Sequence, residues 1–439
     1  MCLYMNRTWI IVLGDLLSFI ISFIILIFVR FSKEQYLSAI DSHTVPFIIL
    51  YFSWVLIFYI FGLYDLFTIK PTIPYFKRWI LAILSSFTVG LLLFYFVPIF
   101  GISPKLNLFI QVIGFGFFSF LFRRMIYTLF ARTITKPAVL VGDSIYLTEL
   151  ENTINSNPQI GLKILNHFQT IGDITSDLEN LKNFVIILDK NIETKDQSIL
   201  KFYKYGVEII DTAKAYEKYL YKIPVEYIDV SFIVENVNIK RDIFYTFATF
   251  LINKVFAMTI LILTSPFMLI AIIARLVEDG RPIFIKQKRV GLNGKIFYLY
   301  KMRSMIVLNP DGSAETTQAI WSTGTNDSRV TPIGKIIRKL HIDEIPQMIN
   351  ILKGDISLVG PRPERPEFVN LLSKDIPYYA FRHVIRPGFT GWAQIKYRYA
   401  RTKEDSKEKF EYDLYYIKNR NIFIDFGIII RTIQIIFTH

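Results

Sequence analysis

The sequence predicts a membrane protein of mixed α and α/β architecture. Three observations favour this fold class. Hydrophobic residues make up 52% of the 439 residues, and the mean hydropathy is +0.37. A soluble protein needs more polar surface than this composition leaves, so much of the chain must be buried in lipid. Four apolar segments occupy the start of the chain, and a stretch in which strand and helix patterns alternate follows them.

The four apolar segments predict four transmembrane helices. Each is close to the roughly 20 residues that a bilayer core requires. The first is too long for the core of a signal peptide, so we expect it to be retained. We therefore predict a four-helix transmembrane bundle as the domain 1–132, from segments at about 8–29, 46–67, 78–98 and 106–122.

Charge and cysteine content narrow the class further. Basic residues that follow the fourth segment, Arg123, Arg124 and Arg132, favour a cytoplasmic location for the N-terminus and for the rest of the chain. The net charge of +13 suits an anionic membrane surface or anionic substrates. We expect no nucleic acid partner, because the positive charge is not gathered in a recognisable binding module. The single cysteine, Cys2, excludes an intrachain disulfide.

The segment 137–228 predicts a small Rossmann-like α/β domain. Apolar runs that end in a turn or a carboxylate, "PAVLVGDS", "FVIILD" and "GVEIID", read as buried parallel strands between helices. A dinucleotide site is a weak interpretation of the first turn. The three-glycine fingerprint is absent, and Asp143 would place a negative charge where a pyrophosphate should lie. A structural or regulatory role is favoured over nucleotide binding.

A fifth apolar segment, 255–274, lies within the predicted membrane helix 243–279 and has Ser265-Pro266 at its middle. Proline removes a backbone donor and bends a helix, and the serine hydroxyl can satisfy the freed backbone. A sharp bend would let the helix enter and leave by the same face of the membrane. A kinked helix that spans the membrane is the alternative on these residues alone.

The chemistry-bearing residues gather in the last 160 residues. Asp343 and Glu344 precede Pro346, which is tolerated only in a first helical turn, so both carboxylates are expected near a helix N-terminus. Adjacent carboxylates among cations form a candidate site for phosphate and Mg²⁺, and a carboxylate can act as a nucleophile on phosphorus. Helix capping is the alternative for the dipeptide alone. The candidate cations are Lys301, Arg303, Arg338 and Arg362.

Six stretches then identify a resemblance. They are "GRPIFIKQKRVG", "YKMRSM", "SRVTPIGKIIRK", "IDEIPQMINILKGDISLVGPRPE", "RPGFTGWAQI" and "YDLYYIKN", in that order. The region from Gly280 onward resembles the bacterial sugar transferase family, the monotopic phosphoglycosyl transferases. The helical start and the α/β segment resemble its long subgroup, the polyprenyl phosphate hexose-1-phosphate transferases of capsule and exopolysaccharide synthesis. Ile342 and Ile345 depart from the family pattern, where leucines are frequent.

The resemblance implies roles for individual residues. Asp343 matches the nucleophile that forms a phosphosugar-aspartyl intermediate. Glu344 matches a magnesium ligand, and we expect Asp343 to be a second ligand of the metal. Asp413 matches a further acidic position near the active site, and we expect it among the residues that bind the substrate. Ser265-Pro266 matches the bend of a re-entrant membrane helix. The basic positions around the substrate phosphates are matched by Lys301, Arg303, Arg338 and Arg362.

The expected function follows from this resemblance. The segment 280–439 would be a mostly α catalytic domain on the cytoplasmic face of the bacterial inner membrane. It would transfer hexose-1-phosphate, from glucose or galactose, from a UDP-sugar to undecaprenyl phosphate with release of UMP. Mg²⁺, membrane lipid and a second copy in a homodimer are the other expected partners. A transporter or flippase of lipid-linked sugars, or a non-catalytic membrane nucleotide sensor, are the alternatives from other classes.

Overall fold

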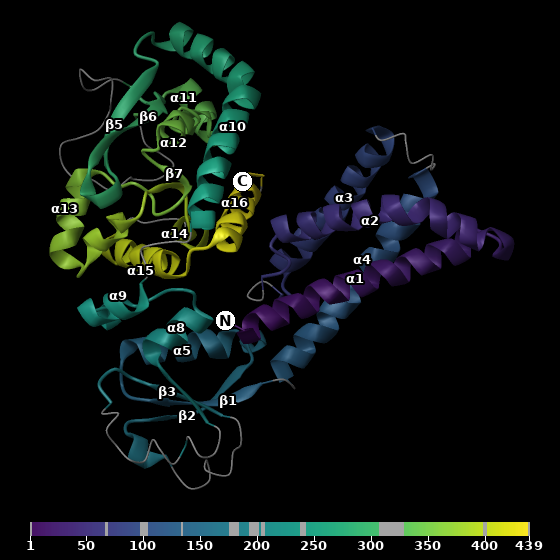
Figure 1. The fold of residues 1–439 in the computed structure, drawn as a ribbon, viewed down its shortest axis with the longest axis horizontal. Helices are drawn as coiled ribbons and strands as arrows, with labels where there is room; N and C mark the ends of the chain where they lie inside the picture. The colour runs from purple at the N-terminus through teal and green to yellow at the C-terminus, as the bar shows by residue number, and fades with distance from the viewer. Residues whose placement is uncertain are drawn as a thin grey trace. The chain divides into compact units, whose positions relative to one another are not determined.

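The computed structural model describes residues 2–65, 69–96, 104–132, 135–174, 184–192, 202, 207–237, 243–306, 329–397 and 402–437. The chain forms two compact units (Figure 1). Unit 1 comprises Met1–Leu220 and Ile436–His439, and unit 2 comprises Tyr221–Ile435.

Unit 1 begins with long helices that pack around one apolar core. They are α1 (Cys2–Arg30), α2 (Tyr36–Ile60), α3 (Ile73–Phe96) and α4 (Pro104–Arg132). The core contains aromatic side chains from several helices, among them Phe19, Trp54 and Phe115. These helices and one in unit 2 are long and apolar enough to cross a membrane, by length and composition. The mostly helical, strongly apolar start agrees with the predicted membrane protein, and the number of crossings stays a prediction.

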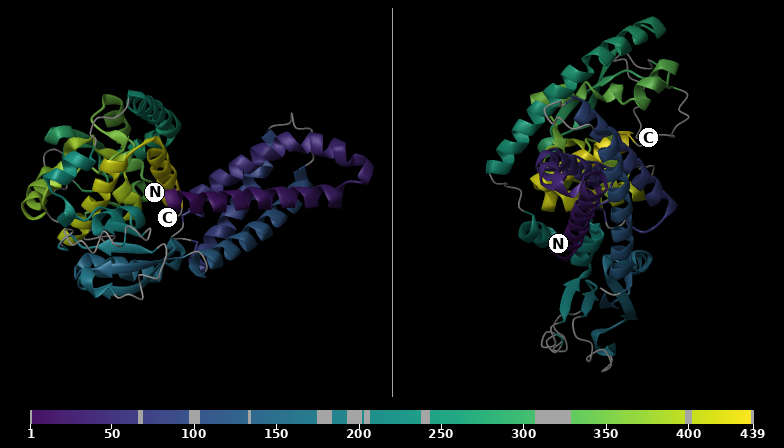
Figure 2. Two further views of the ribbon diagram at one scale, coloured as in Figure 1. Left: turned by 60° about the horizontal axis from the view of Figure 1, so that its bottom comes forward. Right: turned by 90° about the vertical axis from the view of Figure 1, so that its right-hand side faces the viewer.

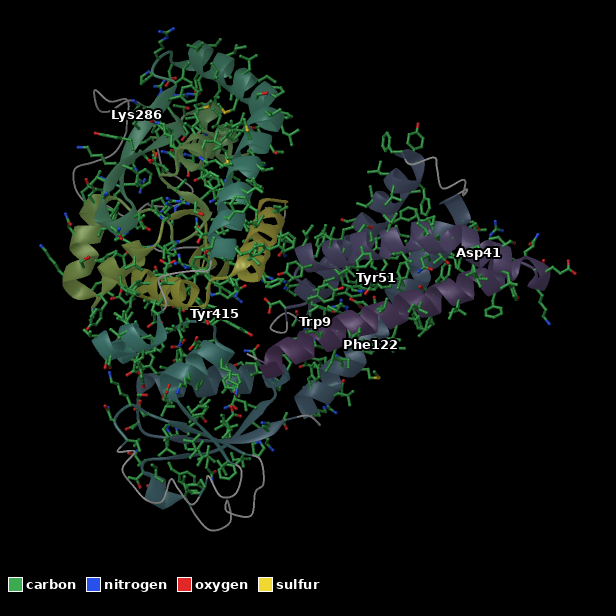
Figure 3. The ribbon with its side chains drawn as sticks, viewed as in Figure 1. Trp9, Asp41, Tyr51, Phe122, Lys286 and Tyr415 are labelled. Atoms are coloured by element: carbon green, nitrogen blue, oxygen red, sulfur yellow. The ribbon has the colours of Figure 1, made fainter. Side chains whose placement is uncertain are left out.

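The outer faces of these helices carry large apolar side chains. Trp9 on α1 is 59% exposed, as Figure 3 shows among the side chains of this part. Leu17 on α1 and Phe117 on α4 are also exposed. A protein in water would leave few such side chains outside, whereas hydrocarbon solvates them. The exposed apolar faces therefore suit lipid.

A buried ion pair joins α1 and α4 inside the same unit. The Arg123 guanidinium donates to the Asp15 carboxylate, and the two side chains are 1% and 0% exposed. Arg123 also donates to the carbonyl oxygen of Leu63 at 2.6 Å. Its guanidinium lies 5.2 Å from the centre of the Phe58 ring and 5.1 Å from that of Tyr64. Each charge thus has its counter-charge within the protein.

The second part of unit 1 is a small parallel sheet with helices. Its strands run in the order β2-β1-β3-β4 and are all parallel. Figure 2 shows the sheet in blue to teal, with helices beside it. Continuous apolar runs form β1 and β3 because both of their faces are buried. The elements are β1 (Lys136–Val141), α5 (Ile145–Ser156), β2 (Leu162–Phe168), β3 (Val185–Leu188), β4 (Glu208–Asp211) and α8 (Thr212–Tyr219).

Gly142, at the end of β1, is required for packing. Its φ is +126°, and a Cβ there would lie 2.4 Å from the Cβ of Asp189, which follows β3. Only glycine allows β1 and β3 to end so close together. The close packing against Asp189 therefore explains why residue 142 is a glycine, without any phosphate ligand.

The segment that begins at Tyr221, after α8, belongs to unit 2. Ile223, Val225 and Ile228 are buried in one cluster with Phe410 and Leu414. The compact units divide after Leu220, and the bounds 137–228 of the α/β domain stay a prediction.

Unit 2 is mostly α-helical, with two small sheets. β5 and β6 form an antiparallel ribbon, and β7 pairs in parallel with β8. The helices are α9 (Val230–Asn236), α10 (Ile243–Glu278), α11 (Pro332–Lys339), α12 (Gln347–Lys353), α13 (Pro366–Asp375), α14 (Trp392–Lys396), α15 (Lys403–Asn419) and α16 (Ile422–Phe437). The strands are β5 (Phe284–Val290), β6 (Ile296–Met302), β7 (Ser357–Val359) and β8 (Gly388–Thr390).

α10 is one helix of 36 residues that contains Pro266 and curves along its length (Figure 1). The Ser265 hydroxyl donates to the carbonyl oxygen of Ile262 at 2.8 Å. The middle of the helix exposes a long apolar surface. Its exposed side chains include Val255, Met258, Ile262, Leu263, Phe267, Leu269, Ile270 and Ile273.

Two stretches of α10 are bonded to the rest of unit 2. Near its start, Asn253 donates to Ser357 Oγ at 3.1 Å and accepts from the backbone N–H of Leu358 at 2.9 Å. Near its end, Arg275 is fully buried and donates to Thr331 Oγ1 at 2.7 Å. The exposed apolar surface lies between these two attachments.

Candidate active site

Asp343 and Glu344 lie beside one lysine. The Lys301 ammonium donates to Asp343 Oδ2 at 3.1 Å and lies 3.6 Å from Glu344 Oε1. The Asp343 side chain is 7% exposed, that of Glu344 19% and that of Lys301 21%. The structure therefore brings together three of the predicted site residues and leaves them partly open to solvent.

The backbone around the carboxylates explains their position. They belong to a short 3₁₀ turn, Ile342–Glu344, which follows His341 in a left-handed conformation with φ of +55°. Pro346 is the N-cap of α12, so the turn leads directly into that helix. The carboxylates thus come just before a helix, as the proline indicated.

Asn350 on α12 fixes the distance between the carboxylates and Lys301. Its side-chain oxygen accepts from the backbone N–H of Tyr300 at 2.9 Å, and its amide donates to the carbonyl oxygen of Tyr298 at 2.8 Å. These bonds pair α12 with the free edge of β6, the strand that carries Lys301. We did not single out Asn350 from the sequence, because an asparagine within a helical pattern carries no signal of a partner strand.

The β5–β6 ribbon presents different chemistry on its two faces. Lys301 pairs with Ile285 and turns toward the carboxylates, whereas Lys286 pairs with Tyr300 on the opposite face. Lys286 projects away from the ribbon in Figure 3. The candidate site is therefore on one face of the ribbon.

Arg362 approaches Glu344 from the loop after β7. Its guanidinium donates to Glu344 Oε1 at 3.3 Å, and its side chain remains 45% exposed. Backbone packing places this loop, because a Cβ on Gly360 would lie 2.5 Å from the carbonyl oxygen of Arg386 and 2.8 Å from the backbone nitrogen of Gly388. The glycines of "GPRPE" and "RPGFTGW" thus let two loops lie backbone to backbone.

The cations hold Glu344 ionised. Burial alone would raise the pKa of Glu344, but Arg362 and Lys301 outweigh this effect and lower it to about 2. Arg362 in turn has a raised pKa, chiefly because Glu344 lies beside it. At neutral pH the site therefore holds fixed ionic charges, with a half-exposed guanidinium available to an anionic ligand.

Two predicted phosphate contacts have other partners. Arg303 is 2% exposed and donates to Asp279 Oδ1 at 2.8 Å and to the carbonyl oxygen of Gly280 at 2.7 Å, so it ties β6 to the end of α10. Arg338 on α11 donates to Ser304 Oγ at 2.8 Å. The structure does not bring Arg303 to the carboxylates, and contact of either arginine with phosphate stays a prediction.

Asp413 is buried on α15. It is 1% exposed and accepts from the Arg382 guanidinium at 2.7 Å. Burial raises the pKa of Asp413 to about 6, although Arg382 acts in the opposite direction. Direct contact of Asp413 with substrate stays a prediction.

The side chains at the site fit one mode of Mg²⁺ binding, in which the protein supplies only one or two carboxylates. Among the described residues, no group of three or more His, Cys, Asp or Glu side chains is placed to hold a metal ion. Mg²⁺ commonly uses only one or two carboxylates and completes its shell with water and substrate phosphates. Asp343 and Glu344 supply such carboxylates, and the pKa of about 2 keeps Glu344 a ligand rather than an acid.

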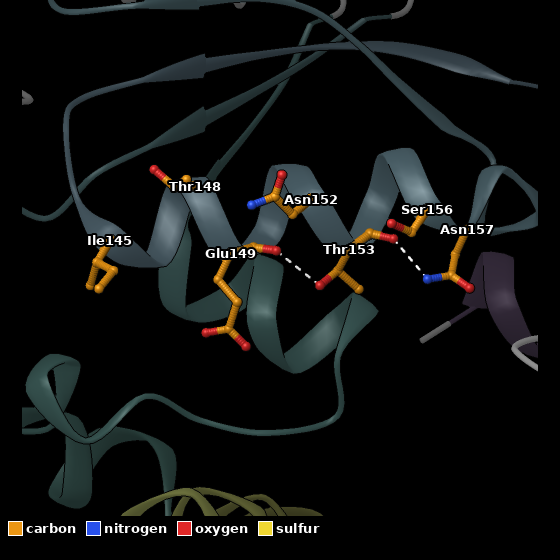
Figure 4. Close-up of a pocket in the computed structure, with 7 residues that line it drawn as sticks. All are labelled: Ile145, Thr148, Glu149, Asn152, Thr153, Ser156 and Asn157. Carbon is orange, nitrogen blue, oxygen red and sulfur yellow. Dashed lines mark hydrogen bonds between the residues drawn. The ribbon is translucent and has the colours of Figure 1, made fainter. Parts of the chain in front are cut away.

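A surface pocket of unit 1 is a different feature. It has a volume of about 450 Å³ and is lined by one face of α5 (Figure 4). Its polar groups partly satisfy one another, since Thr153 donates to the carbonyl oxygen of Glu149 and Asn157 to that of Thr153, each at 2.9 Å. None of its seven lining residues is basic, so it is a poor site for a phosphate.

Comparisons with known proteins point to the same part of the chain. The family model described as bacterial sugar transferase matches residues 244–439. The chain is 44% identical over 176 residues to the UDP-N-acetylgalactosamine-undecaprenyl-phosphate N-acetylgalactosaminephosphotransferase of Aeromonas hydrophila, which is 40% of each chain. It is 36% identical over 182 residues to the UDP-glucose:undecaprenyl-phosphate glucose-1-phosphate transferase of Xanthomonas campestris pv. campestris, covering 41% of this chain and 37% of that protein.

A shorter relative is covered almost throughout. The chain is 40% identical over 178 residues to the uncharacterized sugar transferase EpsL of Bacillus subtilis, which is 40% of this chain and 81% of that protein. The residues that the family model matches, 244–439, contain the two carboxylates, Lys301 and Arg362. The chain therefore belongs to the bacterial sugar transferase family.

Proposed function

We propose that this protein transfers a hexose-1-phosphate from a UDP-sugar to undecaprenyl phosphate, with Asp343 as the nucleophile. The observation that carries the proposal is the partly open cluster of Asp343, Glu344, Lys301 and Arg362. Relatives named for this type of transfer support the substrates, since their printed names combine UDP-sugars with undecaprenyl phosphate.

The transfer has two displacements at one phosphorus atom. An Asp343 carboxylate oxygen attacks the sugar-bearing phosphorus, the bond to the bridging oxygen breaks, and UMP leaves with that oxygen. A phosphate oxygen of undecaprenyl phosphate then attacks the same phosphorus. This attack breaks the bond to the Asp343 oxygen, restores the carboxylate and forms undecaprenyl-diphospho-sugar.

The chain's own cations make the approach of two anions possible. Lys301 reduces the charge that Asp343 and Glu344 present, and the exposed Arg362 guanidinium can bind an approaching phosphate. Mg²⁺ held by Glu344 and Asp343 would supply Lewis-acid stabilisation of the diphosphate. Burial of the Asp343 side chain to 7% exposure restricts the water that could compete as a nucleophile.

Release of UMP tests the reaction. The purified protein is mixed with undecaprenyl phosphate, magnesium and, in turn, UDP-glucose, UDP-galactose and UDP-N-acetylgalactosamine, and UMP is measured. We expect release with one of these sugars, and the panel identifies the sugar. Asp343→Asn should reduce it below detection, and exchange of radioactive UMP into UDP-sugar without the lipid acceptor should also disappear.

A matched control separates loss of the nucleophile from general damage. Asp375 forms a surface ion pair with Lys403 at 2.9 Å, so Asp375→Asn should retain full activity. Full activity in Asp343→Asn would contradict the assigned nucleophile. Absence of UMP release from the unaltered protein with all three sugars would contradict the proposed reaction.

We also propose that α10 is a re-entrant helix and that the active site is cytoplasmic. Asn253 and Arg275 are 22 positions apart, so a straight helix would separate them by about 33 Å, which matches the roughly 30 Å hydrocarbon core. A spanning helix would place them on opposite faces of the membrane. Yet both are bonded to the same compact unit, which cannot lie on two faces at once.

Cysteine labelling in intact cells tests this topology. The sole cysteine is replaced by Cys2→Ser, and single cysteines are then introduced at Lys288, after α10, and at Glu235, before it. We expect both positions to be protected from an impermeant maleimide until the cells are opened. Labelling of only one of the two in intact cells would mean that α10 spans the membrane.

A further inference from the structure

Arg382 is a buried cation at the junction of two elements. Its side chain is 5% exposed, although it is an arginine on a short 3₁₀ segment, Tyr379–Val384. Its guanidinium donates to Asp413 Oδ2 on α15 at 2.7 Å and to the hydroxyl of Tyr379. The same terminal nitrogen that reaches Asp413 also donates to the carbonyl oxygen of Arg362 at 3.3 Å.

The loop that carries Arg362 is thus held at several points. Gly360 packs backbone to backbone against Gly388 and Gly391. At the other end of the loop, the carbonyl oxygen of Glu364 accepts from the backbone N–H of Val290 at 3.0 Å. Between these two points lies Arg362, whose carbonyl oxygen faces Arg382 and whose side chain reaches Glu344.

We propose that Arg382 and Asp413 are positioning residues that set the backbone at Arg362 so that its guanidinium rests on Glu344. The inference deepens the proposed transfer reaction and rests on it for its activity readout. It gives Asp413 a role through the Arg362 loop, in place of the direct substrate contact that its position in the sequence motif implied.

The charges explain why both members are needed. A buried guanidinium without a counter-charge is strongly unfavourable, so loss of the Asp413 carboxylate would free Arg382 to move toward water. Among the residues that the structure describes, Glu364 also lies near Arg382, but its oxygen is 4.0 Å away and its side chain is 29% exposed. Asp413 is therefore the anchor that keeps Arg382 beneath the loop.

A lysine cannot replace Arg382 in this arrangement. The planar guanidinium contacts a carboxylate, a phenol hydroxyl and a backbone carbonyl at once, whereas an ammonium is a single point charge on a flexible stem. Arg382→Lys keeps the positive charge near Asp413 but removes the planar set of N–H donors that makes the three contacts at once. This variant separates positioning from charge.

A double-mutant cycle with Arg362 tests whether Arg382 and Asp413 act through Arg362. Asp413→Asn and Arg382→Lys should each lower kcat/KM for UMP release by about 10- to 100-fold in the otherwise unaltered protein. In an Arg362→Met background the same changes should cost less than about threefold, because the group that they position is gone. Equal losses in both backgrounds, or full activity of Arg382→Lys, would overturn the proposal.

Titration supplies a readout that loss of packing alone would not move. With the pKa of Asp413 raised to about 6, activity should fall as the pH is lowered through 6, and Asp413→Asn should lack this limb. The charged groups that face Asp413 are Arg382, Glu364 and Lys409. The same acid limb in Asp413→Asn would assign it to another group and remove this support.

Hydrogen exchange keeps the proposal testable if a variant folds poorly or if the reaction is assigned wrongly. In Asp413→Asn, and in the charge-neutral double variant Arg382→Gln/Asp413→Asn, the amides of the non-proline residues in 359–365 should exchange at least about tenfold faster. Amides of β1 and β3 should be unchanged. Unchanged exchange at 359–365 would overturn the positioning role, whereas faster exchange without UMP release in the unaltered protein would contradict only the proposed reaction.

Discussion

Two clusters of buried charge in this molecule differ in how completely they are closed. In the helical part of unit 1, one carboxylate and one guanidinium, Asp15 and Arg123, are 0% and 1% exposed. In unit 2, Asp343 and Glu344 face Lys301 and Arg362, whose side chains are 21% and 45% exposed. The first cluster is a closed pair, and the second keeps a cation in contact with solvent.

The difference in exposure is the one expected between an ion pair that stabilises the fold and a cluster that can bind an anionic ligand. A fully buried pair in an apolar bundle has lost its hydration, and each member depends on the other. A partly open cluster keeps hydration and can exchange a protein contact for a phosphate contact. Removal of one charge should therefore cost stability in the first cluster and activity in the second.

The largest expected effect is on the stability of the helical part. Arg123→Met or Asp15→Asn alone should lower the free energy of unfolding by about 3–5 kcal/mol, because each leaves a buried partner unpaired. The double variant should recover most of that loss. Thermal unfolding of the detergent-solubilised protein measures all three. A double variant as unstable as the single variants would mean that Asp15 and Arg123 do not depend on each other for their stability.

The next effect is on activity at the open cluster. Lys301→Met should lower kcat/KM for UMP release by about 10²-fold, near 2.7 kcal/mol, because it removes the ammonium that lies 3.1 Å from Asp343. Its unfolding temperature should change little. Lys353→Met is the matched control, since the Lys353 side chain is exposed and donates to Tyr300. Equal losses in the two variants would mean that the loss does not depend on the ammonium beside Asp343.

The smallest effect concerns another buried carboxylate, Glu411 on α15. Its side chain is 5% exposed and lies 3.6 Å from Lys222, which is 4% exposed. Burial raises the pKa of Glu411 to about 7, and Lys222 only partly opposes this effect. The folded protein thus holds a proton that the unfolded chain, with an ordinary pKa of 4.5, releases.

Glu411 should therefore make stability decrease as the pH rises from about 4.5 to 7. The contribution of Glu411 is fully present below the unfolded pKa and is lost as the pH rises through the folded pKa, which between pH 5 and pH 8 amounts to about 2.5 kcal/mol. Glu411→Gln should flatten this dependence, measured as the difference in unfolding temperature between the variant and the unaltered protein at pH 5 and pH 8. A parallel shift at both values would show that Glu411 does not titrate in this range.

Local patterns were sufficient for much of the fold. Long apolar runs predicted α1, α2, α3 and α4, because about 20 consecutive apolar residues are by themselves typical of a membrane helix. Continuous apolar runs ending in Gly142 and Asp189 predicted the strands β1 and β3. Pro346 placed Asp343 and Glu344 before a helix, because proline constrains the backbone beside it.

Which cation meets which carboxylate depended on the tertiary structure. Among the predicted cations Lys301 and Arg362 reach the carboxylates, whereas Arg303 turns to Asp279. Arg123 entered the sequence argument only as a basic flank of a membrane segment, and it proves to be the partner of Asp15, 108 positions away.

The amino-acid sequence by itself determined the apolar helices, the parallel strands, the family and the pair Asp343 and Glu344. These depend on residues that are neighbours in the chain or that recur at fixed spacing. The tertiary structure alone decided the partner of Asp413, because Arg382 lies 31 positions away on another element. A charge at a given position carries no record of its partner until folding brings the two together, and burial then makes that partner obligatory.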